Sequence, residues 1–218
     1  MNRPKVARNP RQLQFVTSAV NMQGCPADDM PEVAIVGRSN AGKSSLINGL
    51  AKARIAQISS TPGKTRLLNF YVSPNYRLVD MPGYGFSARS GDEQSSWQNM
   101  IEPYLSQREN LVGLLIVMDI RRPWSEDEQN LLHWIEPRGV SSAIILTKAD
   151  KMTRSDIVNT IRKIRAQSGI DDIVATSALK KIGFEELEDL VFRKWIRAED
   201  VPESDGGDDD DNDDDAAE

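Results

Sequence analysis

The residues with the clearest chemical potential lie in one glycine-rich run near the start of the chain. The run consists of Gly37, Arg38, Ser39, Asn40, Ala41, Gly42, Lys43 and Ser44. It fits the pattern G-x-x-x-x-G-K-[ST], in which backbone N–H groups at a helix N-terminus surround phosphate groups. Lys43 would reach the outer phosphates, and the Ser44 hydroxyl would take one position on Mg²⁺. The run therefore predicts a site for a nucleoside triphosphate.

A second group of residues indicates which base the bound nucleotide carries. The apolar run 143–146 is typical of a buried strand and leads directly into Thr147, Lys148 and Asp150. A carboxylate at a strand end can accept hydrogen bonds from both N1 and N2 of guanine, and adenine offers no such pair of donors. The Lys148 stem can lie over the base plane. A later strand, 172–175, leads into a loop whose backbone can contact the guanine O6 edge. That loop consists of Thr176, Ser177 and Ala178.

Two further segments lie between these groups. Residues 76–79 are expected to form a strand ending at Asp80, which would hold Mg²⁺ through a water. The glycine after it, Gly83, lets the backbone approach the γ-phosphate. The polar loop 59–65 lies where a mobile switch would fall, and Thr65 would supply the second hydroxyl to Mg²⁺, with Thr61 as the alternative. These segments add Gly63, Lys64, Thr65, Asp80, Met81, Pro82 and Gly83 to the expected nucleotide contacts, and we expect Lys43, Thr65 and Gly83 to carry catalysis.

The elements that must position these residues alternate along the chain. Residues 32–36 are apolar and β-branched like a buried strand, and residues 45–52 have helical spacing. Further helices are expected over 94–108, from Ser125, over 153–167 and over 183–197. The most apolar stretch, 111–118, is a strand far shorter than the ~20 residues that span a bilayer. The pattern predicts an α/β domain with a mostly parallel sheet.

The order of these motifs resembles translation-factor-class GTPases of the Ras-like fold, and more closely the EngB family of bacterial ribosome-biogenesis GTPases. The narrower likeness rests on Ser39-Asn40 in the glycine-rich run, STPGKT at 60–65, NFY at 69–71, DMPGYG at 80–85, DIRR at 119–122, and Thr147 where Asn is usual. It covers roughly residues 10–198. The resemblance implies a three-layer P-loop NTPase that hydrolyses GTP with Mg²⁺. It also implies a role in assembly of the large ribosomal subunit and in normal cell division and septation.

The same resemblance bears on the rate of hydrolysis. Ras-like enzymes use a Gln shortly after the switch glycine to orient the attacking water, whereas here Tyr84 follows Gly83 directly. We therefore expect slow hydrolysis that a partner stimulates. Related GTPases with Asn at the position of Asn40 can hold a potassium ion beside the phosphates, so K⁺ is a further candidate cofactor.

The charged residues are distributed unevenly along the chain. The net charge is −6, but residues 199–218 hold twelve acidic residues and no Lys or Arg. Residues 1–198 therefore carry 27 basic against 21 acidic residues, a net charge of +6. We expect an N-terminal extension over 1–30, a GTP-binding domain over 31–198 and a disordered acidic tail over 199–218.

The basic body suits a phosphate-backbone partner such as ribosomal RNA, although ordinary solvated helix faces remain an equal reading. Its Arg and Lys residues gather at 3, 5, 8 and 11, at 162, 163 and 165, and at 193, 194 and 197. A single cysteine and the lack of a signal peptide or membrane anchor favour a cytoplasmic monomer.

Other residues carry weaker hypotheses. His133, the only histidine, is expected to pack within a helix and not to act as a base. Arg121 and Arg122 could contact phosphate or could be a solvated pair. Two other functions stay open: a cell-division or membrane-associated regulator acting through protein partners, and a metabolic P-loop kinase or ATPase. Asp150 disfavours the last of these functions, because its carboxylate is expected to recognise guanine and not adenine.

Overall fold

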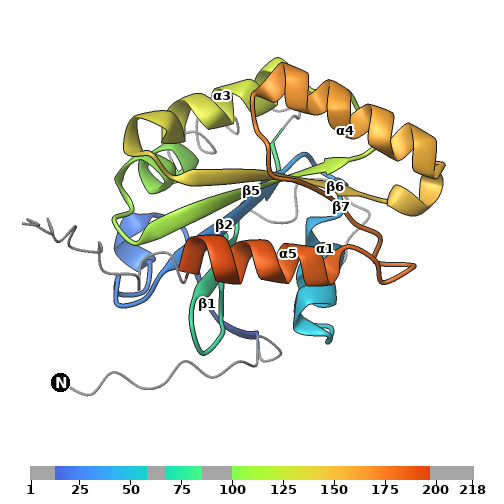
Figure 1. Cartoon of the computed structure of the whole chain (residues 1–218). Helices are drawn as coiled ribbons and strands as arrows, with labels where there is room; N and C mark the ends of the chain where they lie inside the picture. Colours follow the sequence, from blue (N-terminus) through green and yellow to red (C-terminus); the bar gives the residue numbers. More distant parts are fainter. Residues whose placement is uncertain (1–12, 58–66, 85–99, 197–218) are drawn as a thin grey trace, which may run out of the picture.

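Seven strands form one sheet with helices on both faces, as the three-layer α/β expectation required (Figure 1). The computed structural model describes residues 13–57, 67–84 and 100–196. The strands are β1 (Gln14–Ala19), β2 (Glu32–Gly37), β3 (Leu68–Val72), β4 (Arg77–Asp80), β5 (Leu111–Asp119), β6 (Ser141–Thr147) and β7 (Ile173–Ala175). The helices are α1 (Lys43–Ala51), α3 (Glu126–Ile135), α4 (Arg154–Ser168) and α5 (Phe184–Asp189), which continues as a π-helical segment (Leu190–Ile196). Residues 100–107 are also helical.

The strand order β1-β3-β4-β2-β5-β6-β7 places five parallel strands side by side. β3 runs antiparallel to both of its neighbours, β1 and β4. The carboxyl ends of β4, β2, β5, β6 and β7 therefore meet at one edge of the sheet, which we call the carboxyl edge. In open α/β sheets this edge is where ligands bind.

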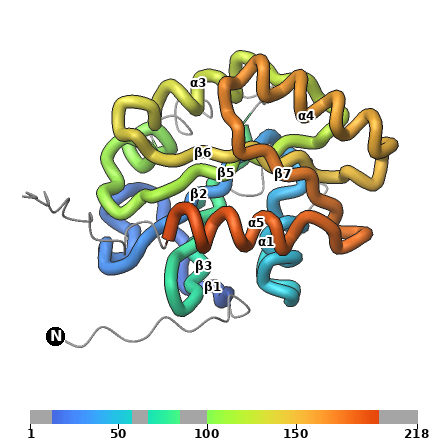
Figure 2. Tube along the Cα trace, viewed as in Figure 1, coloured from blue at the N-terminus to red at the C-terminus, as the bar shows by residue number. Residues whose placement is uncertain are grey.

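Alternating side chains of the central strands build two cores. Val33 and Ile35 of β2 face the layer of α1 and α5, whereas Ala34 and Val36 face the layer of α3 and α4. All four side chains are fully buried. Figure 2 shows the two helical layers on opposite sides of the sheet. Because a parallel strand covered on both faces needs apolar side chains throughout, the strands read as continuous apolar runs in the sequence.

The antiparallel side of the sheet begins before the segment that we expected to start the domain. Residues 14–19 lie in the proposed N-terminal extension, but they form the edge strand β1 and pair with β3. The pairing carries an irregularity between Phe15 and Thr17. Phe15 and Val16 are exposed on this strand.

The helices begin and end near the predicted positions. Ser125 caps α3 with a capping box to Glu128, and Thr153 caps α4 through the N–H of Asp156. His133 lies within α3 as expected, but the expectation that it packs there was wrong, because its side chain is 84% exposed. Among the described residues, no helix is long and apolar enough to cross a membrane.

Candidate nucleotide-binding site

The glycine-rich run forms a tight loop between β2 and α1, which we call the cradle. Its turn needs two left-handed residues, Asn40 with φ 63° and Gly42 with φ 99°. Gly42 caps α1, and its carbonyl accepts the N–H of Leu46 at 2.9 Å. A β-carbon on Gly42 would lie 3.2 Å from Thr147 Oγ1 as well as being strained. The cradle thus opens at the N-terminus of a nine-residue helix, where partial positive charge favours an anion.

The cradle is also fixed against the neighbouring strand. A β-carbon on Gly37 would lie 2.4 Å from the Val117 carbonyl oxygen, so only glycine permits this approach. Arg38 turns its guanidinium away from the cradle and binds Asp127 of α3 at 2.9 Å. Asn40 is exposed at the tip of the loop.

Asp80 ends β4 beside Lys43, the lysine of the cradle. The Lys43 Nζ and Asp80 Oδ1 atoms are 4.0 Å apart, and the Asp80 side chain is 5% exposed. Within the described ranges, Asp80 Oδ1 has no hydrogen-bond partner. Burial raises the pKa of Asp80 to about 6, although the charge of Lys43 opposes this shift.

The buried Asp80 carboxylate, whose Oδ1 atom has no hydrogen-bond partner among the described residues, fits a Mg²⁺ site. Mg²⁺ in nucleotide sites takes only one or two protein carboxylates, with phosphates and water completing its octahedron. The described residues contain no group of three or more His, Cys, Asp or Glu side chains that could hold an ion without such help. Asp80 and Ser44, which lies in the first turn of α1, are the described residues that would hold the ion. Bound Mg²⁺ would neutralise charge on the outer phosphates.

The segment after Asp80 returns to the cradle. The Tyr84 N–H donates to the Gly37 carbonyl at 3.3 Å, and the Ser39 N–H donates to the Tyr84 carbonyl at 3.4 Å. A β-carbon on Gly83 would lie 3.1 Å from Ser39 Oγ, so Gly83 lies directly against the cradle. Met81 does not face the site, because its side chain is fully buried and its N–H donates to the Ile35 carbonyl at 3.0 Å.

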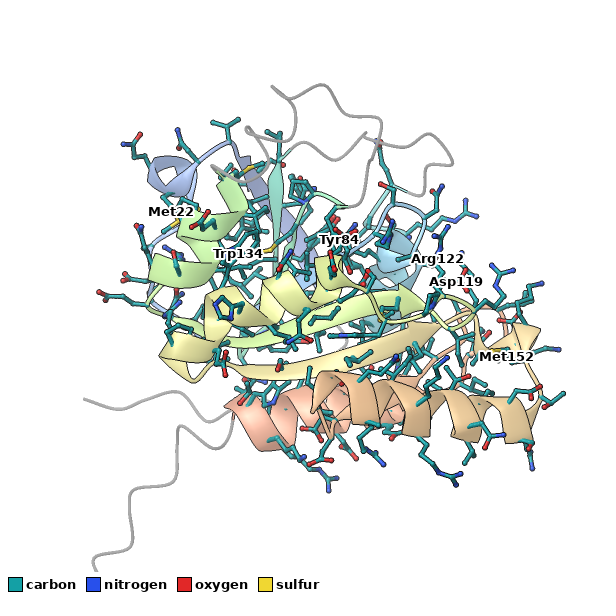
Figure 3. The ribbon with its side chains drawn as sticks, turned by 90° about the horizontal axis from the view of Figure 1, so that it is seen from above. Met22, Tyr84, Asp119, Arg122, Trp134 and Met152 are labelled. Carbon is teal, nitrogen blue, oxygen red and sulfur yellow. The ribbon has the colours of Figure 1, made fainter. Side chains whose placement is uncertain are left out.

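Tyr84 directs its side chain into the protein (Figure 3). Its hydroxyl donates to Glu128 Oε1 at 2.7 Å, and the residue is 5% exposed. Burial and the neighbouring Glu128 carboxylate raise the pKa of Tyr84 well above its usual range. The phenol is therefore neutral and already hydrogen-bonded, which leaves it unsuited to orient a water.

The loop after β6 contacts the cradle through two side chains. The Thr147 hydroxyl contacts the carbonyl oxygens of Ala41 and Met118, the latter at 3.0 Å. The Lys148 ammonium donates to the Asn40 carbonyl at 2.8 Å. Residues more than a hundred positions apart in the sequence thus meet, and the stem of Lys148 spans from the loop after β6, residues 148–151, which we call the base-side loop, to the cradle.

Asp150, the residue expected to recognise the base, is held in place by the loop after β7. The Ser177 hydroxyl donates to Asp150 Oδ1, and this bond lowers the pKa of the carboxyl. The Asp150 side chain is 8% exposed. The Ala149 N–H donates to the Thr176 carbonyl at 3.0 Å, which fixes the two loops together. Ala178 is exposed beside them.

One residue of this edge was missed as part of the site. Asp119 ends β5, and its Oδ2 atom lies 2.9 Å from Lys148 Nζ and 2.6 Å from Arg121 Nη2. In the sequence, Asp119 entered only through the family resemblance of the Asp-Ile-Arg-Arg run, because no local pattern shows that this aspartate meets Lys148. Figure 3 shows Asp119 and Arg122 together at the carboxyl edge. Four of the expected contacts, Thr61, Gly63, Lys64 and Thr65, lie outside the described residues.

Comparison with known families agrees with this geometry. Residues 32–148, from the start of β2 to Lys148, match the family described as "50S ribosome-binding GTPase". The "Probable GTP-binding protein EngB" of Bdellovibrio bacteriovorus is 54% identical over 189 residues, which cover 86% of this chain and 94% of that protein. The protein of the same name from Alkaliphilus metalliredigens is 44% identical over 178 residues, covering 79% of this chain and 86% of that one.

Solved structures show the same fold. A crystal structure of a probable GTP-binding protein EngB aligns with a TM-score of 0.64 and 21% identity, over 77% of this chain and 99% of that one. Era from Aquifex aeolicus, bound to GDP and AlF4⁻, aligns with a TM-score of 0.64 and 26% identity. Era in complex with MgGDPNP and a segment of 16S ribosomal RNA aligns with a TM-score of 0.63 and 25% identity. Each alignment with Era covers 76% of this chain and 57% of that protein.

Replacement of Asp80 by Asn should flatten the pH dependence of stability in EDTA without nucleotide. The pKa of Asp80 in the folded protein, about 6, lies above the ordinary value of 3.8 for an aspartate. The protonated carboxyl therefore favours folding fully below pH 3.8, and this contribution is lost as pH rises through about 6. Between pH 4 and 7.5 the free energy of unfolding of the wild type should fall by about 2–3 kcal/mol relative to Asp80→Asn, at 1.36 kcal/mol per pKa unit. Urea denaturation at each pH measures this difference, and parallel curves would contradict it.

The same variant, Asp80→Asn, should bind GTP in the presence of Mg²⁺ about ten-fold more weakly than the wild type.

Replacement of Asp150 by Asn should exchange guanine for xanthine as the preferred base. The amide still accepts one hydrogen bond and gains a donor, which matches the carbonyl that xanthine carries in place of the N2 amino group. We expect GDP affinity to fall about a hundred-fold and XDP affinity to rise, as titrations with fluorescent analogues would show. The matched control is Ser177→Ala, which loses the hydroxyl that holds Asp150. It should weaken GDP binding without favouring XDP, and unchanged GDP affinity in Asp150→Asn would refute the assignment.

Proposed function

Because the chain belongs to the EngB family of GTP-binding proteins, we propose that it is a slow GTPase switch in assembly of the large ribosomal subunit. The observation that carries this proposal is the match of residues 32–148 to the family described as a 50S ribosome-binding GTPase. That segment contains the cradle, Asp80 and Lys148, so the nucleotide chemistry and the ribosomal description belong to one domain. Such a role would place the protein in the cytoplasm, acting as a monomer between rounds of GTP binding and hydrolysis.

The nucleotide site supports slow turnover. The cradle N–H groups, Lys43 and Mg²⁺ held by Ser44 and Asp80 would stabilise charge on the phosphates during transfer to water. Tyr84, the residue after Gly83, is not available to orient the attacking water, because its hydroxyl already donates a hydrogen bond to Glu128. The proposal therefore assigns orientation of the attacking water to a partner or to a residue outside the described ranges, such as Thr65. A long-lived GTP state suits a timer for assembly.

Basic residues at the carboxyl edge support an RNA partner better than the clusters singled out in the sequence. Three members of those clusters have acidic partners: Arg165 with Asp171, Arg193 with Asp189 and Lys194 with Asp172. Arg162 and Lys163 have none within 4 Å among the described residues, but they lie along α4, which covers one face of the sheet. At the carboxyl edge, beside the nucleotide site, three exposed cations likewise have no acidic partner within 4 Å in the part of the chain that the structure describes. They are Arg122, Lys180 and Lys181, and they follow β5 and β7. Unpaired cations around a nucleotide site could bind an RNA backbone in a way that senses the nucleotide.

The proposal is tested by co-sedimentation with separated ribosomal subunits in GDPNP, GDP and no nucleotide. We expect binding to the large subunit that is strongest in GDPNP. Replacing Arg122, Lys180 and Lys181 with Gln should weaken this binding at least ten-fold and reduce its salt dependence by about two to three units of slope, at 0.7–0.9 per phosphate contact. GDP affinity should not change.

The matched control removes three charges from α4, at Arg162, Lys163 and Arg165. It should weaken binding far less, and equal losses in the two triple variants would refute the assignment to the carboxyl edge. Binding to the small subunit alone, which the Era complex with 16S RNA makes worth measuring, would overturn the large-subunit role. No binding to either subunit, together with defective septation on depletion, would favour the alternative function, a cell-division regulator acting through protein partners.

We also propose that K⁺ assists hydrolysis through Asn40. The residue is exposed at the tip of the cradle with φ 63°, a conformation that asparagine tolerates better than most residues. The rate of phosphate release should be higher in KCl than in NaCl. Asn40→Gly keeps the backbone conformation and removes the amide oxygen, so its rate should not distinguish the two salts. Equal wild-type rates in K⁺ and Na⁺ would exclude this role.

A further inference from the structure

We propose that Asp119 is a positioning residue for nucleotide binding, which holds the Lys148 ammonium against the cradle so that the lysine stem is fixed before the nucleotide arrives. The inference rests on the proposed guanine site and adds to it a residue from a third strand. Lys148 would contact the base, whereas Asp119 would act only through Lys148.

The sheet register brings these residues together. Asp119 is the last residue of β5 and pairs with Thr147, the last residue of β6. Lys148 comes next, and its Nζ atom lies 2.9 Å from Asp119 Oδ2 and 2.8 Å from the Asn40 carbonyl oxygen. One ammonium group therefore joins three segments: the end of β5, the base-side loop and the cradle. The two contacts lie at the tip of the side chain, so they fix the direction of its whole stem.

Burial makes the contact with Asp119 effective. The Asp119 side chain is 7% exposed and the Lys148 side chain 35%. A carboxylate so buried is weakly screened by salt and must be compensated by hydrogen-bond donors. Hydrogen bonds from Arg121 first, and then from Lys148, hold the pKa of Asp119 well below its usual range. The carboxylate is therefore ionised at neutral pH.

The backbone of Lys148 is also held in an unusual state. Its φ is 59°, in the left-handed region that a lysine rarely adopts. Hydrogen bonds on both sides maintain it, from the Ile120 N–H to the Thr147 carbonyl and from the Ala149 N–H to the Thr176 carbonyl, both at 3.0 Å. With backbone and ammonium both fixed, the side chain loses little further rotamer freedom when a ligand binds. A long side chain that is ordered in advance contributes more to affinity, because its ordering cost does not fall on the binding step.

A purely structural reading gives Asp119 a different partner. Arg121 donates from Nε to Oδ1 at 2.9 Å, from Nη2 to Oδ2 at 2.6 Å and from its backbone N–H to Oδ1 at 3.1 Å. On this reading Asp119 serves to close the turn after β5, and Lys148 is incidental. The two readings differ in what loss of the Arg121 side chain does, because Arg121→Ala removes the two side-chain contacts, keeps the backbone N–H contact and leaves the carboxylate for Lys148.

The decisive measurement is GDP affinity and dissociation rate, by stopped-flow fluorescence of a GDP analogue, in four variants of the full chain. Asp119→Asn should weaken affinity about ten-fold, the effect of one charge-assisted hydrogen bond. Arg121→Ala should weaken it several-fold less. Lys148→Ala should weaken it at least as much as Asp119→Asn, and the double variant Asp119→Asn/Lys148→Ala should equal Lys148→Ala alone. Equal effects of Asp119→Asn and Arg121→Ala, or additive losses in the double variant, would overturn the proposal.

A second measurement needs no variant at Asp119 and decides the matter if Asp119→Asn fails to fold. In the nucleotide-free wild type, Lys148 should react with an amine-labelling reagent at least several-fold more slowly than Lys151. Lys151 is 56% exposed and lies 3.8 Å from Asp150, so it is a neighbouring reference. Equal labelling of the two lysines would overturn the proposal. Failure of wild-type GDP binding would instead refute the proposed function, which keeps the two failures apart.

Discussion

The parallel register of β2, β5 and β6 is the constraint on which the rest of the site depends. It sets Gly37 beside Val117 and Asp119 beside Thr147, so the cradle and the base-side loop start at almost the same level. Gly37 approaches the Val117 carbonyl so closely that no β-carbon fits. A slip of one residue would reverse the faces of β2 and separate these loops. The binding chemistry thus follows from strand pairing as much as from the residues of any one motif.

The opposite end of β2 is fixed by a buried ion cluster. Glu32 is fully buried, and its carboxylate accepts hydrogen bonds from Arg108 at 2.8 Å, from Tyr104 at 2.6 Å and from Arg77 at 3.3 Å. A buried carboxylate is costly unless its lone pairs are all matched in this way, and an apolar residue could fill the same space at less risk. The cluster specifies the register of β2, because only one register brings Glu32 to these three donors. The position of β2 in the sheet is therefore fixed at its start by the ion cluster around Glu32 and at its end by the close approach of Gly37 to Val117.

The sequence was most informative where function depends on local order along the chain. The cradle could be predicted because a strand, a turn and a helix N-terminus are consecutive, and Asp80 and Asp150 could be predicted because each follows an apolar strand. Contacts set by strand register could not, since nothing near Asp119 indicates Lys148, 29 residues later. The sequence also did not reveal how exposed individual helical residues are: it places His133 within a helix but does not show that the side chain lies on the solvent face. Acidic partners of Arg165 and Lys194 are likewise supplied by the loop before β7, which a count of charges does not reveal.

The N-terminus of α3 connects the cradle to the segment after Asp80. Asp127 binds Arg38 of the cradle, and Glu128 accepts the Tyr84 hydroxyl. Glu128 also accepts the N–H of Ser125, so it completes the cap of α3 with one oxygen and holds Tyr84 with the other. Movement of Tyr84 would therefore leave a buried carboxylate short of a donor at the point where the helix begins, which costs on the order of 1–3 kcal/mol. Such a cost favours one arrangement of the segment over intermediate positions, as a two-state switch requires. The same hydrogen bond holds the Tyr84 phenol against Glu128, and under the proposed function it would therefore also account for slow hydrolysis.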